Sequence, residues 1–513
     1  MNRRGLRPVA AMIAVAALAT GILTACAAEA PRTEWTPAAW SVVGQVTTDA
    51  PTAAATADTV AMRLRNDDVG IDARWAMLPG DQPINAAIEQ VVRGAVATQA
   101  TTTGTSYRPA VFDAGAGLGE RGCATGAATA VASSVLGDRT GSVVVCEITV
   151  ARGTVFGEIL RTVTGAAGEV TSDTTQAFYT DLATGAVGSA ADLFEGPAAV
   201  WVATVDALRR DFGSLSLADV QPPGDAQLAA FTQSLASARF AGGDVAVPVA
   251  ADLHAPELDG LVRWNARGAQ RPLFVTFTLD EISGALSDLG RAVAVASGPY
   301  SGPVSAGAGF ERMPCDLVPC MAMTLDDGPS TLTPTFLDVL RDQHSAATFF
   351  MLGKNASRHA DTVARVAAEG HEVANHTWDH PYLTDLTDAQ VQAQLGDTRE
   401  LLQRLSGQPV DIFRPPGGYV DDHVVELAGQ PAILWSVDTR DWEGPEAAAL
   451  ARYAIDRPKP STIMLMHDIQ PVTESVFAQV VASLRDRGFQ LVTIDALFGG
   501  SVPSGIVRHG PLG

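Results

Sequence analysis

Two adjacent aspartates, Asp326 and Asp327, follow an apolar run in the segment MTLDDGPS and are followed at once by Gly328 and Pro329. Two neighbouring carboxylates repel each other unless a positive group lies between or beside them. The segment fits a solvated turn, because Asp, Gly and Pro favour turns on their own account. It also fits a site in which one carboxylate binds a cation and the other accepts a proton.

Histidines supply the other ligands that such a cation would need. His254 is the one histidine before Leu340, and His376 and His380 are four residues apart in NHTWDH. In a helix or tight turn, positions i and i+4 share a face and can chelate one ion. Histidines hydrogen-bonded in the core or on the surface would explain this pair equally well. With Asp327 as a third ligand, however, the set is typical of a catalytic zinc or a similar divalent ion.

Three further motifs also end apolar runs. FRPPGGY places Arg414 where it could pair with a carboxylate, and its turn could direct a backbone N–H at an oxyanion. WSVDTRDW contributes Asp438, Asp441 and Trp442, and IMLMHD contributes His467. A carboxylate near His467 would orient the ring and raise its pKa, which makes it a candidate acid. Each motif alone fits a salt bridge, core filling or a capped strand end, but together they favour one shared site.

The elements that must position these motifs are apolar runs alternating with amphipathic helical segments. This alternation predicts a parallel sheet, and about seven strands suit an α/β fold, a distorted and incomplete (β/α) barrel. In such folds the chemistry collects at the carboxyl ends of the strands. The predicted strands are 320–325, 346–352, 371–376, 410–415, 432–438, 462–468 and 489–494.

Length and charge limit the remaining possibilities. The 513 residues predict two or three domains, and 47% hydrophobic with 18% charged residues is a globular composition. The net charge of -22 and the sequence pI near 4.7 argue against a nucleic-acid partner, because neutralising phosphates requires clustered Lys and Arg.

The N-terminus predicts export. Three arginines among the first seven residues precede the apolar stretch 9–23, which is shorter than a spanning helix requires. The stretch ends in LTAC, which resembles the lipobox of bacterial lipoproteins, with Cys26 as the lipidated residue. A plain secretory signal with an incidental cysteine is the alternative. We therefore expect a signal peptide over 1–26 and an extracytoplasmic protein anchored to the cell membrane by a lipid.

Composition also predicts the domain boundaries. Residues 27–58, rich in Ala, Thr and Pro, are interpreted as a flexible tether, and 59–298 as an α+β accessory domain. Gly, Pro and Ser cluster in a linker over 299–315. The barrel domain then occupies 316–500, and 501–513 form a tail.

Four cysteines remain after Cys26, and an even number in an exported chain suggests disulfides. The simplest pairing joins Cys123 to Cys146 and Cys315 to Cys320, although four cysteines permit three pairings. Neither pair has a CxxC spacing or a neighbouring histidine, which argues against zinc bound by thiolates.

The ordered motifs TLDDGP, HTWDH, RPPGG, DTRDW and LMH resemble the five motifs of the polysaccharide deacetylases, the NodB-homology carbohydrate esterases of family 4, over about 316–500. The resemblance implies that Asp326 is the general base. It implies that Asp327, His376 and His380 bind one divalent metal ion, with zinc expected and cobalt, nickel or manganese as alternatives.

The same resemblance implies the remaining roles. Arg414 tunes the base, His467 is the general acid, and Asp441 is its partner. Trp442 and Leu465 resemble the residues that line the acetyl pocket.

Two positions depart from the family pattern. Leu325 replaces the usual Phe of the first motif, which is a conservative change in the core. Gly417 stands where the family usually has Tyr or Phe, so the oxyanion N–H is retained while an aromatic wall of the substrate groove is missing. The identity of the sugar is therefore left open.

The accessory domain resembles the extracellular domain of unknown function (DUF3298) found in some deacetylases and in an anti-sigma factor. FYTDLATGAVGSAADLF and the stretch from FTLDEISGALSDLG to GPYSGPV carry this resemblance. The domain contains no cluster of ligands in the sequence, which favours a binding or positioning role.

The implied activity is hydrolysis of N-acetyl groups on a β-1,4-linked amino sugar, with peptidoglycan as the partner because of the predicted location. Chitin-like or exported glycans, or O-acetyl groups on sugars, are alternatives. An idle barrel in an envelope-binding or sensing lipoprotein is an alternative of another class, although the intact acid, base and three ligands argue against it.

Overall fold

The computed structural model describes residues 44–47, 59–115, 118–216, 218–241, 243–250, 253–261, 273–303 and 312–512. The predicted signal peptide over 1–26, with Cys26, lies outside these residues, as does most of the predicted tether. Across these ranges no helix combines the length and the apolarity needed to cross a membrane.

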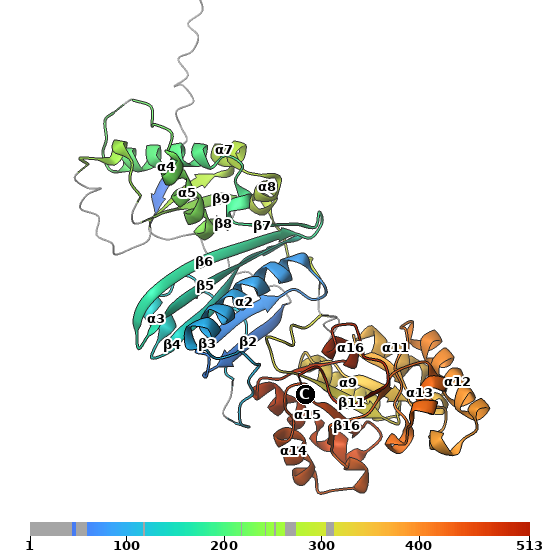
Figure 1. The fold of residues 1–513 in the computed structure, drawn as a ribbon. Coiled ribbons are helices and arrows are strands. Elements are labelled where there is room, and N and C mark those ends of the chain that lie inside the picture. The colour runs from blue at the N-terminus through green and yellow to red at the C-terminus, as the bar shows by residue number, and fades with distance from the viewer. Residues whose placement is uncertain are drawn as a thin grey trace, which may run out of the picture.

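The accessory region contains a six-stranded sheet with the strand order β2-β3-β4-β5-β6-β7. All neighbours in it are antiparallel except β3 and β4. The long helix α2 lies across one face of this sheet (Figure 1), with its apolar side buried. The elements are β2 (Val60–Asn66), β3 (Ile71–Met77), α2 (Pro83–Thr103), α3 (Ala132–Leu136), β4 (Thr140–Arg152), β5 (Val155–Ala166), β6 (Glu169–Asp181) and β7 (Ala186–Ser189).

A second sheet of the accessory region has four strands in the order β1-β10-β9-β8. This sheet and the helices packed on it share a separate hydrophobic core. Its first strand, β1, corrects the predicted tether over 27–58, because Gln45–Thr47 pairs antiparallel with β10 and so belongs to the fold. The elements are β1 (Gln45–Thr47), α4 (Pro197–Asp211), α5 (Asp225–Ser234), β8 (Arg239–Ala241), β9 (Asp244–Val249), β10 (Leu273–Thr278), α7 (Leu279–Ile282) and α8 (Asp288–Val295).

Strands and helices alternate in the third region, as predicted. The confirmed fold class is a distorted (β/α) barrel preceded by an α+β accessory region. The strands are β11 (Cys320–Asp326), β12 (Thr348–Met351), β13 (Glu372–Asn375), β14 (Ala432–Ile433), β15 (Val437–Asp438), β16 (Ile463–His467), β17 (Gln490–Val492) and β18 (Ile506–Val507). The helices are α9 (Thr333–Asp342), α10 (Gly353–Ala356), α11 (Ala360–Ala368), α12 (Asp388–Ser406), α13 (Asp422–Ala428), α14 (Ala447–Asp456), α15 (Pro471–Asp486) and α16 (Ile494–Leu497).

The barrel is irregular in the segments 410–415 and 432–438. In the first, only Phe413 makes isolated parallel bridges, to Asn375 and Ala432. In the second, the chain changes partners, because the Leu434 N–H bonds to Val507 while the Ser436 N–H bonds to Ile463. The predicted single strand therefore becomes β14 and β15.

The predicted tail over 501–513 also needs correction. Within it, Ile506–Val507 forms β18, which pairs in parallel with β14. The Gly510 N–H donates to the Ser461 carbonyl. These residues complete one side of the barrel because they satisfy backbone groups of β14 that would otherwise be unpaired.

The accessory region and the barrel share a continuous buried apolar cluster. Hydrogen bonds also join them, including Leu118 N–H to the Asp486 carbonyl at 3.0 Å and Phe112 N–H to the Arg487 carbonyl at 2.9 Å. Two disulfides are present, Cys123–Cys146 in the six-stranded sheet and Cys315–Cys320 at the start of the barrel.

Candidate active site

The paired aspartates lie at the carboxyl end of β11. Every residue of this strand is buried, as expected for a parallel strand covered on both faces. Asp326 ends the strand, and Asp327 follows with a φ of 71°. The next residue must be small, because a Cβ on Gly328 would lie 2.3 Å from Asp468 Oδ2.

Asp327, His376 and His380 converge on one point. The distance from Asp327 Oδ1 to the Nε2 atom is 3.5 Å for each of the two histidines, and one ligand atom from each residue lies within 4.8 Å of the others. The histidines follow β13. The His376 Nδ1–H donates to the Arg414 carbonyl at 2.7 Å, which leaves the Nε2 lone pair directed at the cluster. This second bond is the usual support of a metal-binding histidine.

Two observations fit a divalent cation at this point. Asp327 Oδ1 is buried and has no hydrogen-bond partner among the described residues. Burial acts to raise the pKa of Asp327, but His376, His467 and His380 outweigh it and lower that pKa to about 2. The carboxylate is therefore ionised, and two imidazole nitrogens with one oxygen are a donor set suited to zinc and related ions.

Arg414 holds the first aspartate. Its guanidinium is fully buried and donates from Nη1 to Asp326 Oδ1 and to Thr324 Oγ1, both at 2.7 Å, and from Nε to the Ile433 carbonyl at 3.0 Å. Burial is the main cause that lowers the pKa of Arg414, and the charge of Asp326 opposes it. Asp326 Oδ2 is left facing His376 Nε2 at 3.7 Å, beside the cation position.

His467 lies next to Asp326 because β16 and β11 pair in parallel at these two residues. Its Nδ1–H donates to Asp441 Oδ1 at 2.7 Å, and its backbone N–H donates to Asp441 Oδ2 at 2.8 Å. Thr473 donates a further bond to the same buried carboxylate. Burial lowers the pKa of His467, but Asp441 outweighs this effect and raises the pKa to about 9.

The three predicted substrate-binding residues have no recorded contact with the cation ligands in the described ranges. Leu465 is buried two residues before His467 on β16, and Trp442 is exposed with the Arg440 guanidinium above its ring. Gly417 has a φ of 62°, a backbone conformation that favours glycine.

Two tyrosines that the sequence analysis missed lie beside Gly417. A Cβ on Gly417 would lie 3.0 Å from both Tyr382 and Tyr419, whose ring centroids are 4.6 Å apart. Both rings are about half exposed, at 47% and 55%. Aromatic side chains are therefore present beside Gly417, although they come from positions 382 and 419 and not from position 417 itself. Their closeness to two motifs, HTWDH and RPPGG, is the signal that could have identified them.

Sequence reasoning also missed a buried carboxyl group, Asp468, directly after His467. Its Oδ2 accepts a hydrogen bond from Thr333, and its backbone carbonyl accepts one from Ser330 at 2.9 Å. Burial raises the pKa of Asp468 to about 7. The side chain packs against Gly328 and so supports the turn that follows Asp327.

These features define a class of protein: an incomplete (β/α) barrel with an Asp-His-His cluster and two buried ion pairs at the carboxyl ends of its strands. The polysaccharide deacetylase family model matches residues 315–432. A peptidoglycan-N-acetylglucosamine deacetylase of Bacillus cereus is 35% identical over 186 residues, which are 34% of this chain and 87% of that protein. The chain belongs to the polysaccharide deacetylase family.

Other relatives match the same part of the chain. The peptidoglycan-N-acetylglucosamine deacetylase PgdA of Listeria monocytogenes is 38% identical over 180 residues, which are 35% of this chain. The chain spans 39% of the length of that relative. A solved structure described as T48 deacetylase with substrate is 38% identical and covers 38% of this chain and 98% of its own, with a TM-score of 0.37.

Proposed function

We propose that the protein is a metal-dependent hydrolase that removes N-acetyl groups from amino sugars of peptidoglycan. One observation carries the proposal: an Asp-His-His cluster lies beside a carboxylate held by Arg414, and an imidazole held by Asp441 is the strand neighbour of that carboxylate. Amide hydrolysis needs such a set, because one group must take a proton from water and another must give a proton to the leaving nitrogen.

Asp327, His376 and His380 would hold the cation, and the donor set favours zinc, with cobalt, nickel or manganese as alternatives. A divalent ion there would supply Lewis acidity to the attacking water and to the amide carbonyl.

Two residues of the protein then carry out the two proton transfers, Asp326 as the base and His467 as the acid. Arg414 occupies Asp326 Oδ1, so Oδ2 is the atom that accepts the proton of the attacking water. His467 is protonated at neutral pH and uses its Nδ1–H to bind Asp441, so Nε2–H is the proton given to the amine. The carbon–nitrogen bond breaks, and acetate and a free amino sugar are the products. The backbone N–H of Gly417 is proposed as a donor to the oxyanion.

The substrate is proposed from the relatives and the exposed aromatic side chains. Relatives in Listeria and Bacillus are named as deacetylases of peptidoglycan N-acetylglucosamine or N-acetylmuramic acid, and one in Azorhizobium as a chitooligosaccharide deacetylase. Tyr382, Tyr419 and Trp442 are exposed near the site and could stack on sugar rings. Peptidoglycan is the substrate we propose. Chitin-like glycans are the alternative substrate, and the assay must distinguish between the two.

The proposed location is the outer face of the cell membrane. LTAC before residue 27 supports a lipid anchor on Cys26, and the accessory region is proposed to position the barrel on its glycan. Labelling cells with a fatty-acid probe tests the anchor, because a Cys26→Ala variant should lose the label.

Mass spectrometry of digested products tests the activity. The purified chain is incubated with N-acetylated peptidoglycan or with chitooligosaccharides, with and without a chelator. We expect loss of acetyl groups from peptidoglycan sugars and none after chelation. Preferential loss from chitooligosaccharides would change the proposed substrate, and no loss from either would leave the metal-binding barrel as a binding module.

A further inference from the structure

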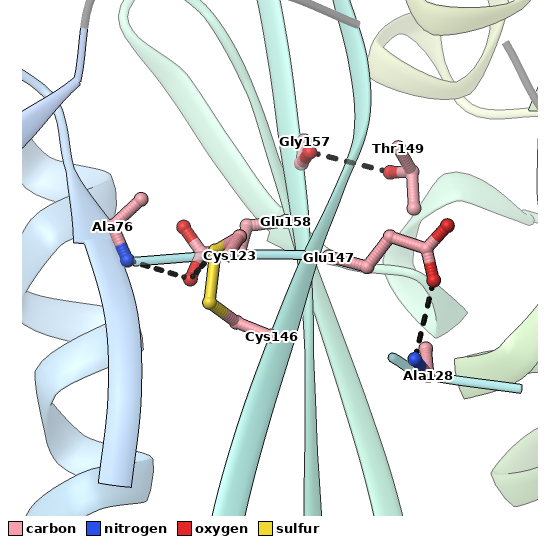
Figure 2. Close-up of a disulfide and its surroundings, with 8 residues drawn as sticks. All are labelled: Ala76, Cys123, Ala128, Cys146, Glu147, Thr149, Gly157 and Glu158. Carbon is pink, nitrogen blue, oxygen red and sulfur yellow. Dashed lines mark hydrogen bonds between the residues drawn. A yellow bond between two sulfur atoms is a disulfide. The ribbon is translucent and has the colours of Figure 1, made fainter. Parts of the chain in front are cut away.

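A buried carboxyl group lies against the disulfide of the six-stranded sheet. Glu158 on β5 is fully buried, and its Oε1 lies 3.3 Å from Cys123 Sγ (Figure 2). One carboxyl oxygen and the two sulfur atoms lie within 4.8 Å of one another. Glu147, on the neighbouring strand, points away from the disulfide and accepts a hydrogen bond from the Ala128 N–H (Figure 2).

Glu158 has fewer partners than a buried carboxylate needs. Oε1 accepts one hydrogen bond, from the Ala76 N–H at 3.1 Å, and Oε2 has no partner among the described residues. Burial raises the pKa of Glu158 to about 8, and the Ala76 hydrogen bond only partly opposes this. Glu158 is therefore protonated at neutral pH, as expected for an unpaired buried acid.

The hydrogen bonds open to this contact differ between the two redox states of the pair. A disulfide sulfur has no proton to donate, whereas a Cys123 thiol at this position would donate its S–H to Oε1. Beside the intact disulfide the protonated carboxyl group is a proton donor, and after reduction its Oε1 can accept a hydrogen bond from Cys123. The two cysteines also differ in access, because Cys123 is half-buried and Cys146 is only 1% exposed.

We propose that Cys123, Cys146 and Glu158 form a thiol–disulfide exchange site that a dithiol reductant opens by attack on Cys123. One thiolate of the reductant attacks Cys123 Sγ and forms a mixed disulfide, and the electron pair of the broken bond goes to Cys146 Sγ. Cys146 takes the proton of Glu158, which avoids a buried thiolate.

The second thiol of the reductant then closes its own disulfide. Cys123 leaves with the electron pair and takes up that thiol's proton. Glu158 regains from solvent the proton that the first thiol released when it ionised. In total, two electrons and two protons pass from the dithiol to Cys123 and Cys146.

The Cys123–Cys146 disulfide lies where its reduction would affect the contact between the accessory region and the barrel. Cys123 lies on the connection between α2 and α3, and the same connection carries Leu118 and Arg121, which bond to the backbone of Asp486 and Arg485 in the barrel. Reduction removes the covalent link that holds this connection to β4.

The second disulfide of the chain allows an internal control. No contact between Cys315–Cys320 and a carboxyl group is recorded in the described ranges, and both disulfides meet the same reductant in one tube. The purified full chain is treated with dithiothreitol at a series of pH values, quenched with acid and alkylated. Mass spectrometry then gives the reduction rate of each disulfide, and their ratio cancels the ionisation of the reductant.

We expect the ratio of the Cys123–Cys146 rate to the Cys315–Cys320 rate to fall about tenfold from pH 7 to pH 9, because Glu158 loses its proton near pH 8. The fall should vanish in Glu158→Gln and persist in Glu147→Gln. A flat ratio in the unsubstituted protein overturns the proposal even if Glu158→Gln does not fold. So does an unchanged slope in Glu158→Gln, or a Cys123–Cys146 bond that resists reduction in the folded chain.

Discussion

Replacing Asp441 by Asn should move the alkaline limit of activity to lower pH. The carboxylate of Asp441 accepts both the ring and the backbone N–H of His467, and it is the main reason that the pKa of His467 is raised to about 9. The difference from the ordinary value of 6.5 corresponds to about 3 kcal/mol in favour of the protonated ring. The amide oxygen of Asn can still accept a hydrogen bond, but it carries no charge to stabilise the imidazolium.

The direction in which the alkaline limit moves follows from the role of His467 as an acid. Activity requires the protonated ring, so it is retained below the pKa of His467 and lost as the pH rises through it. With a pKa of about 9 the ring is about 90% protonated at pH 8, and with a pKa of 6.5 it is about 3% protonated. Asp441→Asn should therefore lower kcat/KM at pH 8 by about thirtyfold or more. A bound cation would lower the pKa of His467 in both proteins, so the comparison between them remains valid.

The assay is the pH dependence of kcat/KM for acetate release from N-acetylated glycan, measured with the metal-loaded protein. Asp438→Asn is the matched control, because Asp438 lies on the neighbouring strand β15 and accepts from the Arg440 N–H at 2.9 Å. The alkaline limit of activity in Asp438→Asn should stay at the pH found for the unsubstituted protein. An alkaline limit in Asp441→Asn at the same pH as in the unsubstituted protein would refute the reasoning, as would a loss of equal size at every pH.

Four further variants test other parts of the site. Asp326→Asn should abolish turnover while the protein keeps one equivalent of metal, whereas His376→Ala should lose both; elemental analysis checks this, and equal metal loss would overturn the assigned roles. Tyr382→Ala combined with Tyr419→Ala should raise KM about tenfold with little change in kcat, because stacking on sugar contributes on the order of 1 kcal/mol; an unchanged KM would exclude the pair from substrate binding. Arg414→Leu leaves a buried carboxylate unpaired and should lower the free energy of unfolding by about 3–5 kcal/mol, measured by denaturant unfolding; a loss below 1 kcal/mol would contradict this.

The barrel could be predicted because the sequence pattern that indicates it lies within short segments of the chain. Apolar runs such as 320–325 alternate with amphipathic segments, and this alternation predicts parallel strands whose carboxyl ends meet. The same argument places Asp326 and His467 together, since both end strands of one sheet, and the structure pairs them directly. The divided strand 432–438 could not be predicted, because its break depends on backbone bonds to Val507 and Ile463, which are distant in sequence.

Short or solitary elements also escaped prediction. Gln45–Thr47 contains three residues and becomes a strand only because β10 offers a free edge to it. The tyrosines beside Gly417 come from two different motifs, and only the fold brings their rings within 4.6 Å. Glu158 is one of many acidic residues in the sequence, and its burial against a disulfide depends on the pairing of β4 and β5.

Crystals of the protein soaked in zinc and measured at the zinc absorption edge would test the central claim most directly. We expect one strong anomalous peak within coordinating distance, about 2.0–2.2 Å, of Asp327, His376 and His380. A peak held by other residues, or no peak at this cluster in a zinc-containing crystal, would contradict the proposal that these three side chains share one cation.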